Sequence, residues 1–410
     1  MASDPDGTAL LTSAKVADLL AAAVAHAGGT LVSWRLDHVD ANPQHSTTAT
    51  YVATADWPTG RREVQLGASA RVEGRSGTDE RAVIFGDGDR EVAVWLYPND
   101  PDLPGLPRAV DPAMLAAMLT EQRAFAAPVA PGQLSLEMIT YRPRRRAVIK
   151  ARLHGPAGVT NLYVKVLRPD TAEGVLTRHQ LLAGAGIPAP RVIAGSNDGL
   201  VVLAELPGRP LAKAIFDEPL PCSAENMIML LDAMPPAVAA LPGRPPWAYA
   251  VDHYAELVAH AMPELGTQLS WLVNEITQGL RTMPSPTVLE PTHGDFHEGQ
   301  LFVAGGVISG VLDIDTVGPG RRVDDLACLL GHLSSIQRMN ADQAARVNGL
   351  VARWMPVFDR RVDPLELRLR SAAVIISLAT GPYRGQEPDW QRETLTMINT
   401  ATGLVRSLRR

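Results

Sequence analysis

The sequence has few cysteines and no surplus of positive charge. Its 410 residues include only two cysteines, Cys222 and Cys328, which are far apart. This scarcity argues against a disulfide framework and favours a reducing compartment, so we expect a cytoplasmic protein. Lysine and arginine number 38 against 44 acidic residues, which gives a net charge of -6. We therefore expect neither nucleic acid nor a membrane as partner, since both select for a clear basic excess.

The sequence also lacks a long uncharged apolar run. The first residues carry no basic segment, and the apolar stretch that follows is interrupted by Lys15 and Asp18. This pattern predicts neither a signal peptide nor a membrane span. Apolar residues make up 46% of the chain and charged residues 20%. That composition is typical of ordinary soluble proteins, and the length allows two or three domains.

The first part of the chain is expected to be an α+β module. A helical pattern over 10–27 precedes five short alternating runs that end near residue 97. This order predicts one helix followed by an antiparallel meander. The prolines of 98–107 exclude a helix or a central strand there, so we interpret this segment as an ordered linker. Another helix is expected at 111–123.

A second group of strands precedes a mainly helical remainder. Alternation predicts strands at 134–141, 147–153 and 161–167, and a helix follows at 171–183. Within the third strand, Lys165 lies on the face opposite the valines that flank it. Beyond residue 208 the pattern is mainly helical, apart from a short strand pair.

The chemistry concentrates between His293 and Asp313. Phosphoryl transfer needs metal ions on the phosphates, a carboxylate near the acceptor hydroxyl and a cation on the phosphates. His293 and Asp295, followed by Gln300, have the spacing of a kinase catalytic loop, with the aspartate as base and the amide as metal ligand. Asp313 ends an apolar strand, where it would hold Mg²⁺ together with the Gln300 amide oxygen.

The motifs HGDFHEGQLFV, GVLDID and DDLA resemble the aminoglycoside phosphotransferase and choline kinase superfamily, a branch of the protein-kinase-like fold. The resemblance extends over roughly residues 134–410. It implies ATP and Mg²⁺ as cofactors, with Asp295 as the catalytic base, Gln300 and Asp313 as Mg²⁺ ligands and Lys165 as the phosphate-binding lysine. It also implies structural roles for two residues, His293 as a brace of the catalytic loop and Asp325 as a tie between helix and loop.

Gln300 stands where members of this superfamily usually have asparagine. A glutamine there, the acidic pair Asp313 and Asp315, and a module before the kinase lobes resemble the maltokinase and glucosamine kinase branch of actinobacteria. Asp315 is either a weak metal ligand or a structural acid. His297 is either an orienting residue of the loop or a satisfied structural histidine.

The implied fold class is α+β. It combines an antiparallel-sheet N-lobe with a mainly helical C-lobe, preceded by an α+β N-terminal cap. We expect the cap at 1–125, the N-lobe at 126–206 and the C-lobe at 207–410. Backbone groups of Glu205 and Leu206 would form the hinge that reads the adenine edge.

Two features of the expected N-lobe leave alternatives open. Lys150 rivals Lys165, but the alternating apolar residues around Lys165 favour it, and Glu173 is its default acidic partner. The usual kinase glycine-rich loop is missing, and the tip of the first hairpin reads RPRRR at 142–146. Arg145, with its neighbours, would contact the ATP phosphates there; the alternative is a solvated basic tip.

The acceptor site is expected in the insert at 380–393. Its aromatic and acidic residues could hold a sugar, with a ring against the C–H face and acids on hydroxyls or an ammonium group; they are Tyr383, Glu387, Asp389 and Trp390. The alternative is an ordinary helix–helix loop anchored by its tryptophan. Just beyond the metal loop, Arg321 and Arg322 would either stabilise the catalytic loop or pair with Asp324.

The leading prediction is an ATP- and Mg²⁺-dependent kinase that phosphorylates a hydroxyl of a sugar or amino sugar, with glucosamine first and maltose second. The partners would be ATP and a small-molecule acceptor, and the protein would be a monomer or a homodimer. One alternative is an aminoglycoside phosphotransferase of antibiotic resistance. Another, of a different class, is a nucleotide-binding pseudokinase or regulatory module, which the change at Gln300 and the absent glycine-rich loop leave open.

Overall fold

The computed structural model describes residues 6–42, 45–71, 81–86, 91–156, 158–284, 288–336 and 339–408. Backbone contacts divide the chain into two compact units. The sheet unit comprises 1–173, 192–205 and 384–386, and the helical unit comprises the remainder.

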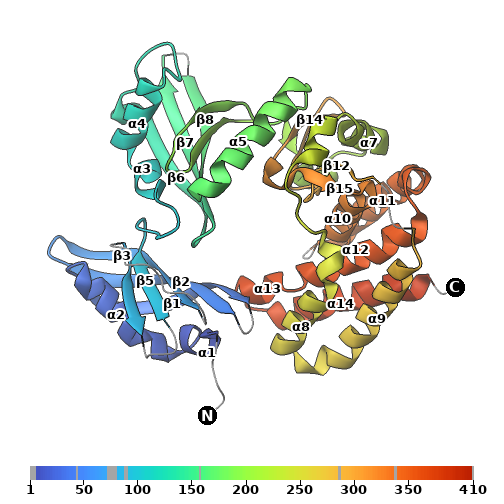
Figure 1. The fold of residues 1–410 in the computed structure, drawn as a ribbon, viewed down its shortest axis with the longest axis horizontal. Coiled ribbons are helices and arrows are strands. Elements are labelled where there is room, and N and C mark those ends of the chain that lie inside the picture. The colour runs from blue at the N-terminus through green and yellow to red at the C-terminus, as the bar shows by residue number, and fades with distance from the viewer. Residues whose placement is uncertain are drawn as a thin grey trace. The chain divides into compact units, whose positions relative to one another are not determined.

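The first sheet of the sheet unit is an antiparallel meander (Figure 1). Its strand order is β1-β2-β3-β5-β4, with β1 at Thr30–Asn42, β2 at Ser46–Trp57, β3 at Gly60–Arg71, β4 at Val83–Gly86 and β5 at Glu91–Leu96. Helices α1 (Thr8–Leu11) and α2 (Ala17–His26) share its core. The expected helix and meander are confirmed, but the single helix predicted at 10–27 is divided. Ser13 caps a short 3₁₀ turn between the two helices because its side chain accepts the Lys15 amide.

A second five-stranded antiparallel sheet has the order β6-β7-β8-β10-β9. Its strands are β6 (Leu134–Arg142), β7 (Arg146–Gly155), β8 (Gly158–Leu167), β9 (Val192–Gly195) and β10 (Leu200–Ala204). The predicted strands at 134–141, 147–153 and 161–167 are therefore confirmed. Helices α3 (Leu106–Val110) and α4 (Pro112–Glu121) contribute buried leucines to the core of this sheet. Asp111 begins α4 by accepting the amides of Ala113 and Met114.

The helical unit carries most of the α-helices and two small sheets (Figure 1). One small sheet has the order β11-β13-β14, with β11 at Arg209–Pro210, β13 at Leu301–Ala304 and β14 at Val307–Val311, and β13 and β14 form a hairpin. The other pairs β12 (Glu290–Thr292) with β15 (Gly318–Gly320). Helix α5 (Pro169–Gly184) begins in the sheet unit and ends in the helical unit. The main helices are α6 (Leu211–Asp217), α7 (Ala224–Asp232), α8 (Val251–Ala261), α9 (Gly266–Arg281), α10 (Arg322–Ser334), α11 (Ala341–Arg361), α12 (Pro364–Leu378), α13 (Gly381–Arg384) and α14 (Trp390–Ser407).

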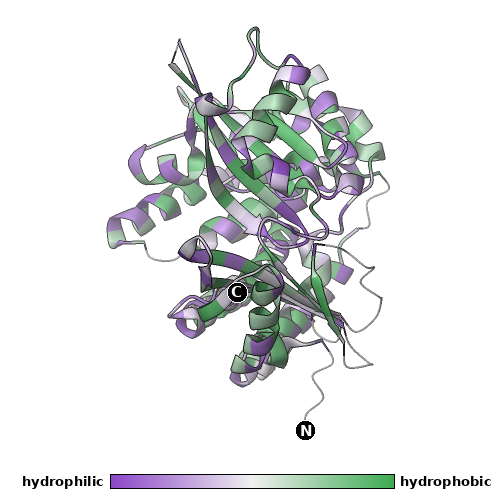
Figure 2. Cartoon of the chain, turned by 90° about the vertical axis from the view of Figure 1, so that its left-hand side faces the viewer, coloured by the Kyte–Doolittle hydropathy of each residue, from purple (hydrophilic) through white to green (hydrophobic). Residues whose placement is uncertain are grey.

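Helix α12 lies at the centre of the helical unit and contacts α10, α14, α9 and α8. Apolar residues such as Leu367, Ile375 and Ile376 are fully buried on it. Its start is fixed by Asp363, whose side chain accepts the Glu366 amide, and by Pro364 in the first turn. In Figure 2 hydrophilic residues occur along the helices. No helix in the described part of the chain is both long enough and apolar enough to cross a bilayer.

Candidate active site

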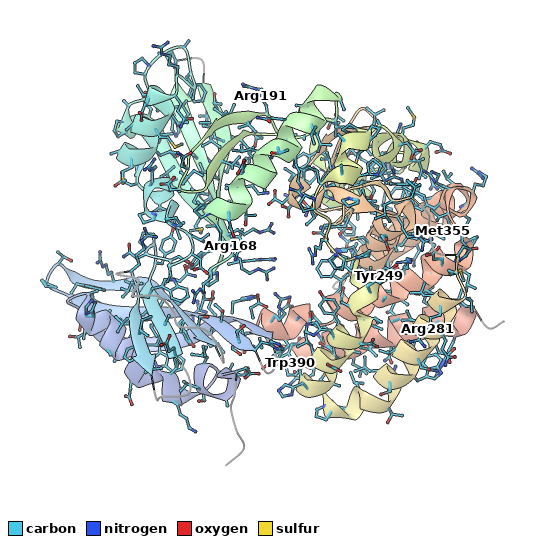
Figure 3. The ribbon with its side chains drawn as sticks, in the orientation of Figure 1. Arg168, Arg191, Tyr249, Arg281, Met355 and Trp390 are labelled. Carbon is cyan, nitrogen blue, oxygen red and sulfur yellow. The ribbon has the colours of Figure 1, made fainter. Side chains whose placement is uncertain are left out.

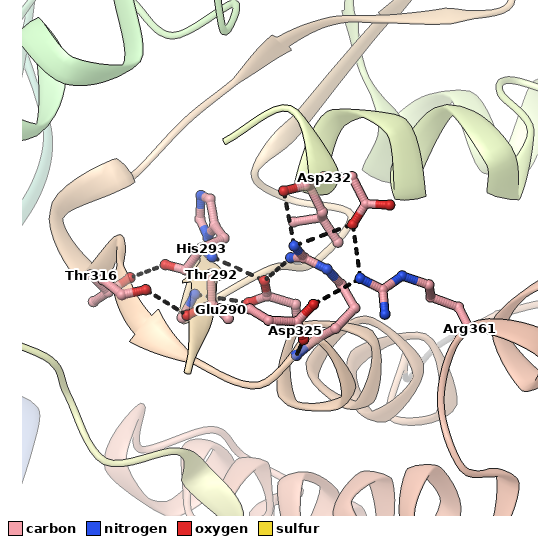
Figure 4. A network of polar contacts seen from close by, with 11 residues as sticks. Asp232, Glu290, Thr292, His293, Thr316, Asp325 and Arg361 are labelled. Atoms are coloured by element: carbon pink, nitrogen blue, oxygen red, sulfur yellow. Dashed lines mark hydrogen bonds and ion pairs between the residues drawn. The ribbon is translucent and has the colours of Figure 1, made fainter. Parts of the chain in front are cut away.

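The loop that begins at His293 is held to helix α10 by one carboxylate. It follows β12 (Glu290–Thr292), which pairs with β15 (Gly318–Gly320). Asp325, in the first turn of α10, accepts the His293 amide at 3.0 Å and the Gly294 amide at 2.8 Å. Figure 4 shows this carboxylate at the centre of a network of polar contacts. The expected tie between helix and loop is confirmed.

Two further contacts brace the loop. The His293 imidazole is 2.9 Å from the Leu312 carbonyl oxygen through Nε2, and the Thr316 hydroxyl donates to the His293 carbonyl at 2.9 Å. These contacts connect the start of the loop to the segment that follows β14. His293 is fully buried, in agreement with the bracing role that the resemblance implied.

Arg322 extends the network from Asp325 to α7. Its guanidinium lies 3.4 Å from Asp325, 3.4 Å from Asp232 and 2.9 Å from the Leu231 carbonyl oxygen. Burial raises the pKa of Asp325, whereas His293, Arg322 and the two loop amides lower it. A buried carboxylate with this many donors is retained as a structural anchor of the loop.

The candidate metal ligands lie on neighbouring backbone segments. The backbone amide of Leu312 donates to the backbone carbonyl of Gln300 at 2.7 Å. Asp313 directly follows Leu312, so the backbone segments of the two candidate ligands are hydrogen-bonded to each other. Asp313 has φ 51° and ψ 48°, a left-handed conformation that aspartate tolerates better than most residues. The amide and carboxylate offer hard oxygen atoms, which fit Mg²⁺. The residues present are therefore suited to that ion.

Asp295, the candidate base, lies beside three polar residues. The Cys328 thiol is 3.8 Å from its Oδ1, and the side chains of His297 and His332 offer ligand atoms within 4.8 Å of its carboxylate. The two imidazole rings stack with centroids 4.0 Å apart. Burial and the neighbouring His297 lower the pKa of His332 to about 3. Burial and the Asp295 charge raise the pKa of Cys328 well above its usual value, so His332 is neutral and Cys328 is a thiol at neutral pH.

The candidate phosphate-binding lysine lies in the sheet unit. Lys165 is on β8, opposite Val148 of β7 and Val201 of β10, and only 8% of it is exposed. Its rival, Lys150, lies 3.9 Å from Glu205 and over the Tyr163 ring. Lys150 thus has partners suited to a surface ion pair, and Lys165 remains the predicted phosphate contact. Its pairing with Glu173 also remains a prediction.

The two side chains at the expected hinge, Glu205 and Leu206, each contact other residues of the unit to which they belong. Glu205 accepts from Asn161 at 2.8 Å and from the Tyr163 hydroxyl at 3.4 Å. Leu206 is 8% exposed and borders Gly310 of β14. The recognition of the adenine edge by the backbone of Glu205 and Leu206 stays a prediction.

A sequence model of the phosphotransferase enzyme family matches residues 152–361, just over half of the chain. The chain belongs to the phosphotransferase enzyme family. The match begins near the end of β7 and covers β8, the catalytic loop and helix α10. No curated protein matches this phosphotransferase significantly in sequence.

Solved structures are similar to this phosphotransferase at low sequence identity. A thermostable mutant of aminoglycoside phosphotransferase APH(4)-Ia, in ternary complex with ADP and hygromycin B, is 15% identical with a TM-score of 0.47, covering 67% of this chain and 95% of that chain. Choline kinase from Cryptosporidium parvum Iowa II is 12% identical with a TM-score of 0.47, covering 70% and 94%. Macrolide 2'-phosphotransferase MphH from Brachybacterium faecium is 19% identical with a TM-score of 0.43, covering 69% and 97%.

The arginine-rich tip of this phosphotransferase is fixed by two aspartates of the linker. Arg144 has φ 60°, its amide donates to Asp100 at 2.8 Å, and its guanidinium binds Asp102 at 2.9 Å. The Asp100 carboxylate is fully buried and also accepts the Tyr141 hydroxyl at 2.7 Å. Arg145 is more exposed, at 59%, and pairs with an aspartate of β1. Arg144 is therefore committed to structure, and Arg145 remains the predicted phosphate contact.

The predicted acceptor residues lie around the start of α14. Tyr383 and Trp390 pack edge to face with centroids 5.0 Å apart, and Trp390 (Figure 3) also packs against the core of the helical unit. Asp389 is exposed and pairs with Arg392 at 2.8 Å. Glu387 accepts the Trp390 amide through its backbone carbonyl at 3.2 Å. The structure brings the two aromatic rings together, and the acceptor role of all four residues stays a prediction.

Among the described residues neither Arg321 nor Arg322 forms an ion pair with Asp324. Burial raises the pKa of Asp324, and the charges of Arg370 and Arg321 lower it. Arg322 stabilises the catalytic loop through Asp325, whereas Arg321 pairs with Glu366. Asp324 is bonded instead to a residue of α12, Arg370, at 2.7 Å. Asp324 and Asp325 are consecutive in the first turn of α10, so their side chains point in different directions and bind different arginines. Sequence spacing alone did not predict which arginine each would bind.

Sequence reasoning also missed Cys328 and His332 as neighbours of the candidate base. A signal for them was present. Cys328 and His332 follow Asp325 by three and seven positions on α10, so all three lie on the same face of the helix. Once Asp325 was assigned to the loop, the other two could have been placed beside it.

Proposed function

We propose that this phosphotransferase transfers the γ-phosphoryl group of ATP to a hydroxyl of a sugar or amino sugar. The observation that carries the proposal is the anchored loop. Asp325 holds the backbone of His293 and Gly294, which precede Asp295 in the loop, and the Gln300 carbonyl accepts the amide of Leu312, the residue before Asp313. A carboxylate beside amide and carboxylate oxygens is the arrangement that phosphoryl transfer to an alcohol needs.

In this mechanism Asp295 orients the acceptor hydroxyl and takes its proton as the oxygen attacks the γ-phosphorus in line, while the bond to the β–γ bridging oxygen breaks and ADP leaves. The oxygens of Gln300 and Asp313 would hold Mg²⁺, which neutralises charge on the phosphates when it is bound. Lys165 and Arg145 would contribute positive charge to the phosphates. The backbone at 205–206 would position the adenine.

The acceptor class is proposed from the residues near the start of α14. An aromatic pair, Tyr383 and Trp390, offers apolar ring surface for the C–H face of a sugar, and Glu387 and Asp389 offer carboxylates. A carboxylate matches an ammonium group better than a neutral hydroxyl does, so glucosamine is the first expected acceptor and maltose the second. We place the enzyme in the cytoplasm as a monomer or homodimer, with residues 1–125 as its cap.

An ATP-depletion assay over an acceptor panel tests the proposal. The panel contains glucosamine, maltose, glucose and several aminoglycosides, each with excess Mg²⁺. We expect the highest kcat/KM with glucosamine and a loss of about 10²–10⁴-fold for Asp295→Asn, the usual contribution of a general base. Preferred turnover of an aminoglycoside would assign the enzyme to antibiotic modification. No turnover with any hydroxylated acceptor would favour a nucleotide-binding regulatory module instead.

A further inference from the structure

Two histidines meet beside the candidate base, and the mechanism above uses neither. His297 is on the catalytic loop and His332 is near the end of α10. One ligand atom from each, together with a carboxylate oxygen of Asp295, lies within 4.8 Å of the others. Both rings and the carboxylate are half-buried. The three side chains are therefore a compact group of nitrogen and oxygen donors.

Further donors surround this group. The Cys328 thiol is fully buried and 3.8 Å from Asp295 Oδ1. Glu298 Oε2 is buried, lies 4.0 Å from His297 Nδ1 and has no hydrogen-bond partner in the part of the chain that the structure describes. A buried carboxylate oxygen without a donor is costly unless a cation or a proton satisfies it.

The imidazole of His332 is available to a ligand. Its ring stacks on that of His297, and neither of its nitrogens forms a hydrogen bond with another residue that the structure describes. The His297 ring accepts the Gly299 amide at Nδ1, 3.1 Å away, and its Nε2 lies 3.1 Å from the Gln300 amide nitrogen. Metal binding at His297 would displace one of these two contacts.

We propose that Asp295, His297 and His332 form a binding site for a divalent transition metal of the zinc type, with Cys328 or Glu298 as a fourth ligand. Imidazole nitrogen, carboxylate oxygen and thiolate sulfur are the donors that Zn²⁺ takes in tetrahedral sites. Mg²⁺ selects oxygen ligands, so a site with two imidazoles discriminates against it. Its three ligands differ from the Mg²⁺ ligands proposed above, Gln300 and Asp313, although His297 contacts the Gln300 amide at 3.1 Å.

Ring rotation is needed to complete the site. The His297 and His332 planes are parallel within 5°, so their in-plane lone pairs run side by side and do not converge on one point. The torsion that turns a histidine ring about its Cβ–Cγ bond is soft. One ring can turn toward Asp295 while its backbone stays fixed, and the stack opens when the metal binds.

Occupation of this site would block the proposed reaction. A carboxylate that ligates a metal is no longer free to take the acceptor proton, so Zn²⁺ would inhibit turnover even in excess Mg²⁺. This consequence rests on the proposed function. The binding itself does not, and the two are measured separately.

The test uses the full chain, stripped of metal with a chelator and kept in excess Mg²⁺. Titration with Co²⁺ reports ligation through visible absorption bands of the tetrahedral ion, and calorimetric titration with Zn²⁺ gives affinity and stoichiometry. The variant is His332→Gln. The matched control is His260→Gln, which changes an exposed histidine of α8 in the same unit. Thermal unfolding of each variant checks that it is folded.

We expect one equivalent of metal, tetrahedral Co²⁺ bands that Zn²⁺ removes and Mg²⁺ does not, and a loss of affinity of more than about tenfold for His332→Gln. Loss of an outer-shell partner alone costs about 10–100-fold. His260→Gln should bind as the unmodified chain does. Equal affinity of the chain and of folded His332→Gln would overturn the proposal. Absence of the bands from the unmodified chain would overturn it without any variant. Zinc binding with unchanged turnover would keep the site and contradict the role of Asp295 as base.

Discussion

Replacement of Asp325 by alanine should release the catalytic loop while leaving most of the fold intact. The side chain is fully buried and accepts the amides of His293 and Gly294 at 3.0 and 2.8 Å. Without it, both amides lose their partner. Arg322 keeps the Leu231 carbonyl at 2.9 Å and the partly exposed Asp232 at 3.4 Å, but it loses Asp325, which is its buried carboxylate partner.

The size of the effect follows from these contacts. Each hydrogen bond to a charged group contributes about 1.5–3 kcal/mol, and removal of one partner from a buried ion pair costs about 3–5 kcal/mol. The two figures describe the same carboxylate, so they are not added. We expect Asp325→Ala to cost about 3–5 kcal/mol of local stability, and Asp325→Asn about half of that, because one carbonyl oxygen remains as acceptor.

Hydrogen exchange measures this locally. Amides that open by local unfolding exchange in proportion to the opening equilibrium, and 1.4 kcal/mol corresponds to about a tenfold change. Peptides covering 293–300 should therefore exchange at least about 100-fold faster in Asp325→Ala, and about tenfold or more in Asp325→Asn. The matched control is Asp342→Ala, an exposed aspartate in the first turn of α11, which should stay close to the unmodified chain.

One outcome would refute the reasoning. If the loop peptides of folded Asp325→Ala exchange at the rate seen in Asp342→Ala, the two hydrogen bonds do not hold the loop. A uniform acceleration over the whole helical unit would show instead that Asp325 supports global stability more than the loop.

Three further outcomes are expected. Burial raises the pKa of Glu298 to about 7 from an ordinary 4.5, so its stabilising contribution is complete at low pH and is lost as pH rises through about 7. In urea unfolding, the free energy of unfolding of Glu298→Gln relative to that of the unmodified chain should rise by on the order of 2–3 kcal/mol between about pH 5 and pH 8. A difference that does not change with pH would contradict this. Trp390→Ala should raise the acceptor KM by more than about tenfold and leave the ATP KM unchanged, since a lost aromatic face affects the sugar alone; an equal rise in both would point to a structural role. Burial raises the pKa of Cys222 to about 12 and that of Cys328 well above its usual value, so a thiol reagent should modify neither in the native protein and both after denaturation.

The sequence was most informative where the decisive interactions are local. The strands at 134–141, 147–153 and 161–167 could be predicted because alternation and turn residues lie within each hairpin. The single helix predicted at 10–27 is divided, because the capping side chain of Ser13 fixes a break that apolar periodicity does not reveal.

Parts of the site that depend on distant segments could not be predicted. Asp324 pairs with Arg370, which is 46 positions away, and nothing in the sequence distinguishes this partner from the adjacent Arg321. The stack of His297 on His332 depends on how α10 crosses the loop, which is a property of the packed core. By contrast, the tie from Asp325 to the loop was implied by a motif, in which the distant partners are already specified.

The buried carboxylate of Asp100 has a consequence for shortening the chain. A version that starts at residue 126 would remove it and leave the Tyr141 hydroxyl and the Arg144 amide without their acceptor. It would also remove α3 and α4, whose leucines cover the second sheet, and expose that apolar surface to water. Such a protein should aggregate on expression, whereas one that begins just before β5 would retain the acid, both helices and the covered sheet.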